Sequence, residues 1–224
     1  KIPLLEIKNT ANAAIDEFEK VVQLRLHAKE VVAQTQEKAN KLFSVIKSSP
    51  LDDIDVFVSN LANLRTLRGE VISLKEIRYV ETSFITELET EIVAETERIS
   101  QHCVSFLLDE KALNPYHARV LDKQGEIESI SKVSEGKKLE KEVSQITTDL
   151  EMLIDIVSNL NIEDTSHATQ IINNISLIFA TLNKVKAEIK NKVSTLGGKE
   201  AKADFAAQMK LMDQSIINAL NQDK

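Results

Sequence analysis

Apolar and polar positions recur along most of the chain with the spacing of packed α-helices. Between residues 9 and 48, apolar side chains are separated alternately by three and four residues, the heptad pattern of a helix that packs along a partner helix. Only Arg25 and Thr35 interrupt the pattern. Its apolar members are Ala11, Ala14, Phe18, Val21, Ala28, Val32, Ala39, Leu42 and Ile46. We expect this helix to end at Ser-Ser-Pro, residues 48–50, because proline keeps the preceding residue out of the α conformation.

A second helical pattern begins near residue 51 and continues to about residue 108. Its first turn contains three aspartates, whose charges complement the amino end of a helix. The pattern changes near Gly69. Beyond that glycine, apolar residues recur every eleven positions, as at Ile77, Leu88 and Ile99, and this period suits a nearly straight helix. We therefore predict that residues 1–112 form a long helical hairpin whose apolar seam changes near Gly69.

The second half of the chain, residues 113–224, carries further helix signals. Asn114 and Pro115 fit the N-cap and the first position of a helix, and Ser134 fits the cap of the next helix. Two heptad seams follow. Their members are Leu139, Val143, Ile146, Leu150, Leu153 and Val157, and then Ala168, Ile171, Ile175, Ile178, Leu182, Val185 and Ile189.

Two adjacent glycines, Gly197 and Gly198, are expected to end the second of these seams, because glycine often follows the last turn of a helix. A short last helix is predicted over residues 199–221. Residues 113–224 are therefore predicted to be a helical bundle or coiled-coil continuation that packs with the first part.

The composition supports a fold made of helices alone. The 224 residues include 5 glycines, 3 prolines and no tryptophan, and only 4% are aromatic. Few helix breakers and few large rings indicate thin aliphatic contacts between helices. No segment shows the alternation of a strand or an Asn-Gly hairpin turn. We predict an all-α fold, an elongated antiparallel helical bundle with coiled-coil stretches.

The charge distribution disfavours nucleic acid as a partner. The formal net charge is −7, and residues 81–110 alone hold eight acids against one base, Arg98. Affinity for a phosphate backbone rests on Lys and Arg, so direct nucleic-acid binding is not expected. No apolar run approaches the roughly 18 residues of a membrane span, and no signal peptide is visible. We expect a cytoplasmic chain without membrane contact.

No nucleotide-binding loop is predicted. The sequence Gly-Gly-Lys-Glu at 197–200 is similar to the end of such a loop. The full loop requires glycine five residues before the Gly-Lys pair and serine or threonine after it. The chain has Val193 and Glu200 at those positions. The glycines are therefore interpreted as a helix stop, and no ATP or other cofactor is expected to bind this segment.

No metal or catalytic site is predicted either. The histidines lie on four different segments without the Glu-x-x-His spacing of di-metal bundles; they are His27, His102, His117 and His167. Asp164 lies three residues before His167, but in the first turn of a predicted helix, where the aspartate serves the backbone. The single cysteine excludes an intrachain disulfide and a Cys-based zinc site. Adjacent helical residues do not face each other, so Cys103 beside His102 is expected to be a buried structural thiol.

Two groups of cations remain. Lys184, Lys186, Lys190 and Lys192 lie near the end of a predicted helix, where positive charge complements the dipole. The other group, within residues 64–81, is Arg65, Arg68, Lys75 and Arg78. Three interpretations of the second group stay open: a solvated helix face whose cations pair with internal acids, a docking patch for another part of the protein or a partner protein, and a nucleic-acid contact.

Four stretches carry a family resemblance. They are LRTLRGEVISLKEIRYVE, ETERISQHCVSFLL, LIDIVSNLNIEDTSHATQIINNISLIFATLN and FAAQMKLMDQSIINAL. Together they resemble a family of large bacterial proteins described as DNA repair ATPases. That resemblance implies a very long chain in which helical, coiled-coil regions accompany an AAA-type ATPase module. This segment resembles the helical part, so ATP is expected only for the full-length protein.

The sequence thus predicts a non-catalytic helical structural or interaction region of a large ATPase. We interpret the chain as a piece of a longer protein, because it starts without methionine and ends inside a helical pattern. The expected partners are other domains of the same chain or partner proteins. Two alternatives stay open: a free-standing helical adaptor or scaffold, and, more remotely, a helical-bundle metalloenzyme.

Overall fold

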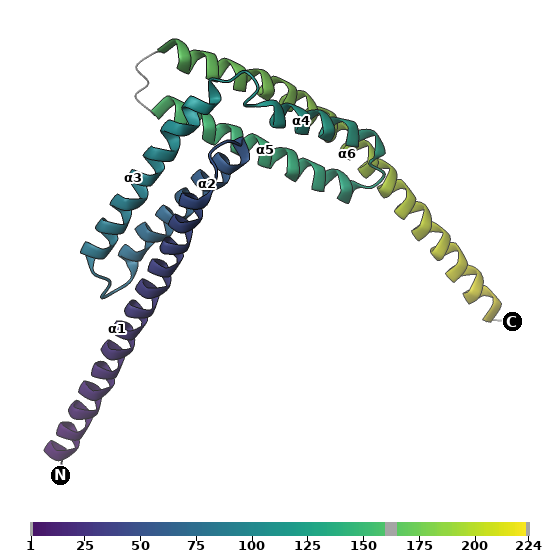
Figure 1. The fold of residues 1–224 in the computed structure, drawn as a ribbon. Coiled ribbons are helices and arrows are strands. Elements are labelled where there is room, and N and C mark those ends of the chain that lie inside the picture. The colour runs from purple at the N-terminus through teal and green to yellow at the C-terminus, as the bar shows by residue number, and fades with distance from the viewer. Residues whose placement is uncertain (1, 160–164, 223–224) are drawn as a thin grey trace. The chain divides into compact units, whose positions relative to one another are not determined.

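The computed structural model describes the backbone of residues 2–159 and 165–222. These residues form α-helices and two short 3-10 helices, and no strand occurs among them. The predicted all-α class is confirmed. By its internal contacts the chain divides into two compact units, residues 1–106 and residues 107–224. Figure 1 shows the helices of each unit.

The first unit contains α1 (Ile2–Ser48), α2 (Ile54–Ser73) and most of α3 (Thr82–Leu107). α2 runs back alongside α1, and α3 reverses again alongside α2 (Figure 1). An ion pair joins Lys38 of α1 to Glu70 of α2, with 2.6 Å between Nζ and Oε1. The rings of Phe57 and Phe106 pack between α2 and α3 with their centroids 5.3 Å apart. Asp53 caps α2 by accepting a hydrogen bond from the Asp55 N–H at 2.8 Å.

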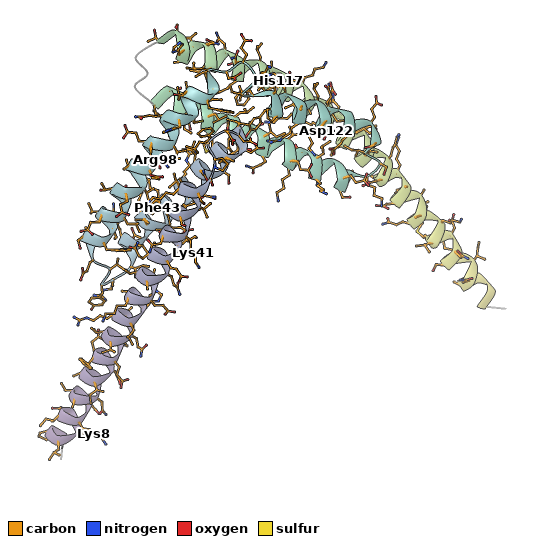
Figure 2. All side chains as sticks on the ribbon, in the orientation of Figure 1. Lys8, Lys41, Phe43, Arg98, His117 and Asp122 are labelled. Carbon is orange, nitrogen blue, oxygen red and sulfur yellow. The ribbon has the colours of Figure 1, made fainter. Side chains whose placement is uncertain are left out.

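The heptad seam of α1 is buried only in its second half. Ala28, Ala39 and Ile46 are at most 2% exposed. Thr35, a predicted interruption, is also buried, and its hydroxyl donates to the Val31 carbonyl at 2.8 Å. From residue 3 to residue 20 every side chain of α1 is exposed, although the same pattern continues there. This stretch extends beyond α2, as the position of Lys8 in Figure 2 shows.

The prediction of one continuous helix from about residue 51 to residue 108 is wrong. α2 ends at Ser73, a 3-10 helix η1 (Leu74–Glu76) and a turn follow, and α3 begins at Thr82. The Ser73 hydroxyl donates to the Glu70 carbonyl at 2.6 Å, a bond typical of residues that compete with helix continuation. The apolar spacing runs unchanged through this segment, so the pattern did not reveal the break. Gly69, where a change was expected, lies inside α2.

The second unit contains α4 (Asn114–Glu126), a 3-10 helix η2 (Ile127–Ser129), α5 (Val133–Asn159) and α6 (Thr165–Gln222). α5 runs antiparallel to the first half of α6, and α4 packs against both. Both predicted seams lie in the core except at Ala168, the first predicted member in α6, which is only half-buried. Fully buried or nearly so are Leu139, Val143, Ile146, Leu150, Leu153 and Val157 of α5, and Ile171, Ile175, Ile178, Leu182, Val185 and Ile189 of α6.

α5 and α6 approach closely at Gly136. A Cβ atom added there would overlap the Val193 side chain of α6. The amino end of α5 is fixed by two carboxylates. Glu135 accepts from the Ser131 N–H at 2.9 Å, and Glu200 of α6 accepts from the Val133 N–H at 2.9 Å. The predicted cap, Ser134, lies inside the helix instead.

Two other predicted boundaries in this unit are wrong. Gly197 and Gly198 do not end a helix, and no separate helix begins at residue 199, because α6 continues through both glycines to Gln222. Neither glycine has positive φ. Each glycine destabilises a helix by about 1 kcal/mol relative to alanine, and the helix-favouring residues on both sides offset this cost. The N-cap of α4 is Leu113, without a side-chain cap, rather than Asn114.

Two glycines inside helices, the exposed Gly69 and the buried Gly136, predict opposite effects of an added methyl group. Gly69 has nothing within 4 Å of an added Cβ, so Gly69→Ala should raise the free energy of unfolding by up to about 1 kcal/mol. Gly136→Ala must displace Val193, and overpacking costs about 1–3 kcal/mol, so a net loss is expected. Urea unfolding followed by circular dichroism measures both. A lower free energy of unfolding for Gly69→Ala, or a higher one for Gly136→Ala, would contradict the surroundings of these two glycines in the structure.

Candidate functional site

The segment between α2 and α3, residues 74–81, brings charged and aromatic side chains together, and we call it the joint. The guanidinium carbon of Arg25, from α1, lies 5.3 Å from the centroid of the Tyr79 ring, and that of Arg78 lies 5.8 Å from the same centroid. Both distances are within the range of cation–π attraction. Tyr79 is 43% exposed. One aromatic ring therefore holds two cations from segments more than fifty residues apart, on an accessible surface.

The backbone of Tyr79 is in the left-handed region, with φ of 69°, alone among the non-glycine residues described. A side chain in this region costs free energy, since Cβ approaches the following carbonyl. Two backbone hydrogen bonds stabilise the reversal. The Ile77 N–H donates to Leu74 O at 3.0 Å, and the Val80 N–H donates to Ile77 O at 3.4 Å, across Tyr79. Backbone strain of this kind is concentrated at functional positions and switch regions.

The four cations of the predicted patch have different surroundings in the structure. Arg68 pairs with Glu89 of α3 at 3.2 Å, the internal pairing that the solvated-face interpretation expects. Arg65 is engaged as well. Arg78 lies on Tyr79, and Lys75 forms no ion pair within the described part of the chain. Arg25 and Tyr79, the residues that complete the joint, were not in the predicted set. Docking by the patch stays a prediction.

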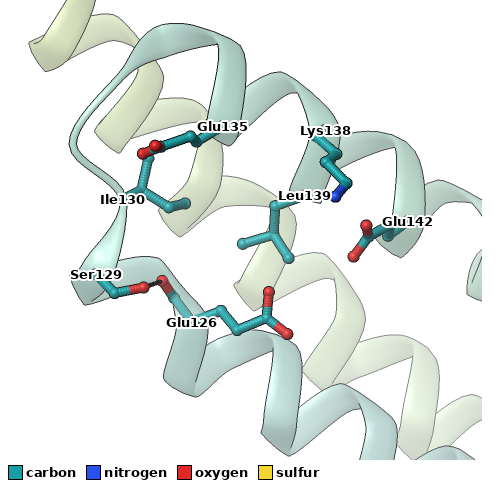
Figure 3. Close-up of a pocket in the computed structure, with 7 residues that line it drawn as sticks. All are labelled: Glu126, Ser129, Ile130, Glu135, Lys138, Leu139 and Glu142. Atoms are coloured by element: carbon teal, nitrogen blue, oxygen red, sulfur yellow. Dashed lines mark hydrogen bonds between the residues drawn. The ribbon is translucent and has the colours of Figure 1, made fainter.

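A cavity of about 300 Å³ lies in the second unit, where η2 leads into α5 (Figure 3). It is lined by Glu126, Ser129, Ile130, Glu135, Lys138, Leu139 and Glu142. Its carboxylates serve the fold. Lys123 Nζ lies 2.9 Å from Glu126 and 2.7 Å from Glu142, and these bonds raise the pKa of Lys123 and lower that of Glu142. Hydrogen bonds from the backbone of Ser131 and Lys132 lower the pKa of Glu135.

A second cavity in the same unit, about 240 Å³, is lined by Leu107, Asp109, Glu110, Leu113, His117, Gln170, Asn174 and Leu177. Asp109 accepts a hydrogen bond from the Lys111 N–H at 2.8 Å and so stabilises the turn before α4. Within residues 2–159 and 165–222, no group of three or more His, Cys, Asp or Glu side chains is placed to hold a metal ion.

Cys103 is the buried thiol that was expected. It is fully buried in α3, and burial raises its pKa to about 12, so the reactive thiolate is disfavoured. The neighbouring His102 places Nδ1 2.8 Å from the Arg98 carbonyl oxygen and does not serve the thiol. In the lysine run, Lys192 Nζ donates to the Glu128 carbonyl at 3.4 Å. The predicted capping role of Asp164 lies outside the described residues.

Comparison with known proteins gives one result. Residues 111–195 match a family model described as a domain of unknown function (DUF7902). No curated protein and no solved structure matches the chain. The matched region covers α4, α5 and the half of α6 that packs on them, and it stops before Gly197. Among the described helices none is both long and apolar enough to cross a membrane.

The left-handed backbone at Tyr79 predicts a reversed ranking of two substitutions. Tyr79→Ala and Tyr79→Gly both remove the ring that holds Arg25 and Arg78, but only glycine adopts positive φ without a Cβ penalty. Tyr79→Gly should therefore be more stable than Tyr79→Ala by about 1 kcal/mol. At an ordinary helical position alanine is favoured instead. Urea unfolding measures the difference, and an alanine variant of equal or greater stability would show that the position is not strained.

Proposed function

We propose that this chain is a non-catalytic helical interaction region of a large cytoplasmic bacterial ATPase of the DNA repair type. One observation carries the proposal: α1 and α6 continue well beyond the helices that cover them, and exposed apolar side chains recur along one face of each uncovered part. In α6 these exposed apolar residues, each at least 41% exposed, form what we call the α6 stripe: Phe205, Met209, Met212 and Ile216.

The spacing of the α6 stripe supports docking by another helix. Its members are separated by four, three and four residues, which places them on one face. Leu196 is the last buried residue among the described side chains of α6 and precedes Phe205 by nine residues, so the stripe lies on the opposite side of the helix from the buried seam. The α6 stripe is therefore not an extension of the core of this unit. Exposed apolar surface of this kind marks sites of association.

The charge pattern and the engaged carboxylates favour an interaction role over chemistry. The acids of the larger cavity are held by Lys123 and by backbone N–H groups. The resemblance to the ATPase family supplies the proposed context, in which a helical region transmits movement, sets spacing or holds a partner. A free-standing adaptor is the competing interpretation, and the first experiment below distinguishes the two.

Site-specific cross-linking tests the proposed context. A photoreactive amino acid at position 212, on the α6 stripe, in the complete protein encoded by the gene should cross-link to peptides of an ATP-binding module in the same polypeptide. Position 214, on the opposite face of α6, is the matched control and should cross-link little. A reading frame without an ATP-binding module, or cross-links confined to a separate protein, would favour the adaptor instead.

Nucleotide titration tests the non-catalytic role. Phosphate binding by a glycine-rich loop needs backbone N–H groups that point freely at the ligand. Gly197, Gly198 and Lys199 lie inside α6, where helical hydrogen bonds occupy those groups. Isothermal titration of the 224-residue chain with Mg-ATP should therefore give no binding heat, and a coupled assay should give no hydrolysis. Micromolar affinity for ATP would contradict the proposal.

A further inference from the structure

The uncovered half of α1 carries an apolar stripe with a regular internal order. We call this set of residues the α1 stripe; its members are Leu4, Ile7, Ala11, Ala14, Phe18 and Val21. The first five are exposed and Val21 is half-buried; Leu4, Ile7 and Phe18 are 78%, 68% and 69% exposed. Ile15 and Val22, beside the stripe, are exposed too. The surface is too large and too apolar for a side of a helix that faces only water.

The α1 stripe is continuous with an interface that already exists in the fold. Its spacing of three and four residues continues without a shift into Ala28, Ala39 and Ile46, which are buried within the first unit. The residues that cover a heptad seam are those of another helix, packed along it. The partner of the α1 stripe is therefore a helix that lies along α1.

The order of side-chain sizes along the α1 stripe fits a second copy running in the opposite direction. Along the α1 stripe, neighbouring members are separated alternately by three and four residues. When two such helices lie antiparallel, a residue followed by a gap of three faces a residue of the other copy that is followed by a gap of four. Aligned in this way, Leu4 faces Val21 of the other copy, Ile7 faces Phe18, and Ala11 faces Ala14. Large side chains meet at both ends and alanines meet at the centre. All six positions are used, and no buried residue of α1 is required.

A parallel pair is disfavoured by the next position of the heptad, Arg25. In a parallel pair, Arg25 would face the same residue of the other copy, so two like charges would meet in an apolar contact. In the antiparallel alignment the six stripe positions pair with one another and Arg25 does not face Arg25 of the other copy; its guanidinium lies over Tyr79. The antiparallel alignment also places the two copies of α2 and α3 at opposite ends of the helix pair. In a parallel pair they would compete for the same face.

We propose that two copies of this chain associate through the α1 stripe, as an antiparallel helix pair centred between residues 12 and 13. This inference does not depend on the proposed ATPase context. Each copy contributes the same six residues, so the interface is self-complementary, as two-fold symmetry requires.

Cysteine pairing tests the alignment. Ala11→Cys and Ala14→Cys are made separately in a Cys103→Ala background, and each variant is oxidised alone and in an equal mixture. The antiparallel pair predicts a disulfide-linked dimer chiefly in the mixture, between position 11 of one copy and position 14 of the other. A parallel pair would cross-link each variant with itself. Efficient self-linking without preference for the mixture, or no linking, would overturn the proposal.

Sedimentation equilibrium with matched aspartate variants tests the surface. The unmodified chain should sediment at twice its monomer mass of 25.1 kDa at micromolar concentration. Ile7→Asp and Phe18→Asp should weaken the dimer by about a hundredfold or more, because each puts a charge into the contact twice. Leu5→Asp is the control, since Leu5 is 61% exposed but off the stripe. Circular dichroism checks that each variant stays helical.

In the sedimentation experiments, three further results would overturn the proposal. One is a monomer at all accessible concentrations, and another is an equal loss in the Leu5→Asp control. The third is a dimer that survives Phe18→Asp but dissociates with Met212→Asp, which would move the self-contact to the α6 stripe.

Discussion

The structure depends on one constraint: aliphatic side chains must be removed from water along narrow lines where helices touch. With few aromatic residues, no single side chain supplies a large share of the buried area. Each helix instead contributes one branched aliphatic residue about every turn, as from Ile171 to Ile189 in α6, where the seam residues are fully buried. The stabilising contacts are therefore spread along the helices, and a small change in the distance between two helix axes alters the packing at every one of these contacts. Gly136 shows this most directly, because there one methyl group decides whether α5 and α6 can approach.

The sequence predicted these seams well because a period of three and four residues is a property of neighbours along the chain. Leu139 and Ile175 were placed in the core on that basis and are buried. The same period could not locate the reversal after Ser73, since apolar residues continue through it in register. What reverses the chain after α2 is local: the Ser73 hydroxyl donates to a carbonyl at the end of α2, and Tyr79, beyond η1, lies in the left-handed region. Gly197 and Gly198 failed as a stop signal because the residues that follow favour helix independently of any packing partner.

The site was harder to predict than the fold, for a similar reason. Each cation in residues 64–81 was visible in the sequence, and so was Arg25, as a charge in an apolar pattern. That Arg25 meets the Tyr79 ring depends on α1 and the joint being brought together in three dimensions. Single-sequence periodicity contains no information about such a pairing. The internal partner of Arg68 was expected only as a class, the acids of residues 81–110, and the structure identifies it as Glu89.

The continuity of α6 through its two glycines has a mechanical consequence. The part of the helix beyond residue 198 is about 36 Å long at 1.5 Å per residue, so a tilt of about 10° at its base moves its far end by about 6 Å. The base is also the place where bending is easiest, because paired glycines add no side chains to resist it. α5 is tied to α6 beside this point through Glu200. The uncovered half of α6 can therefore bend most easily at Gly197 and Gly198, where it leaves the helices that pack against α6, and a small bend there moves its far end the most.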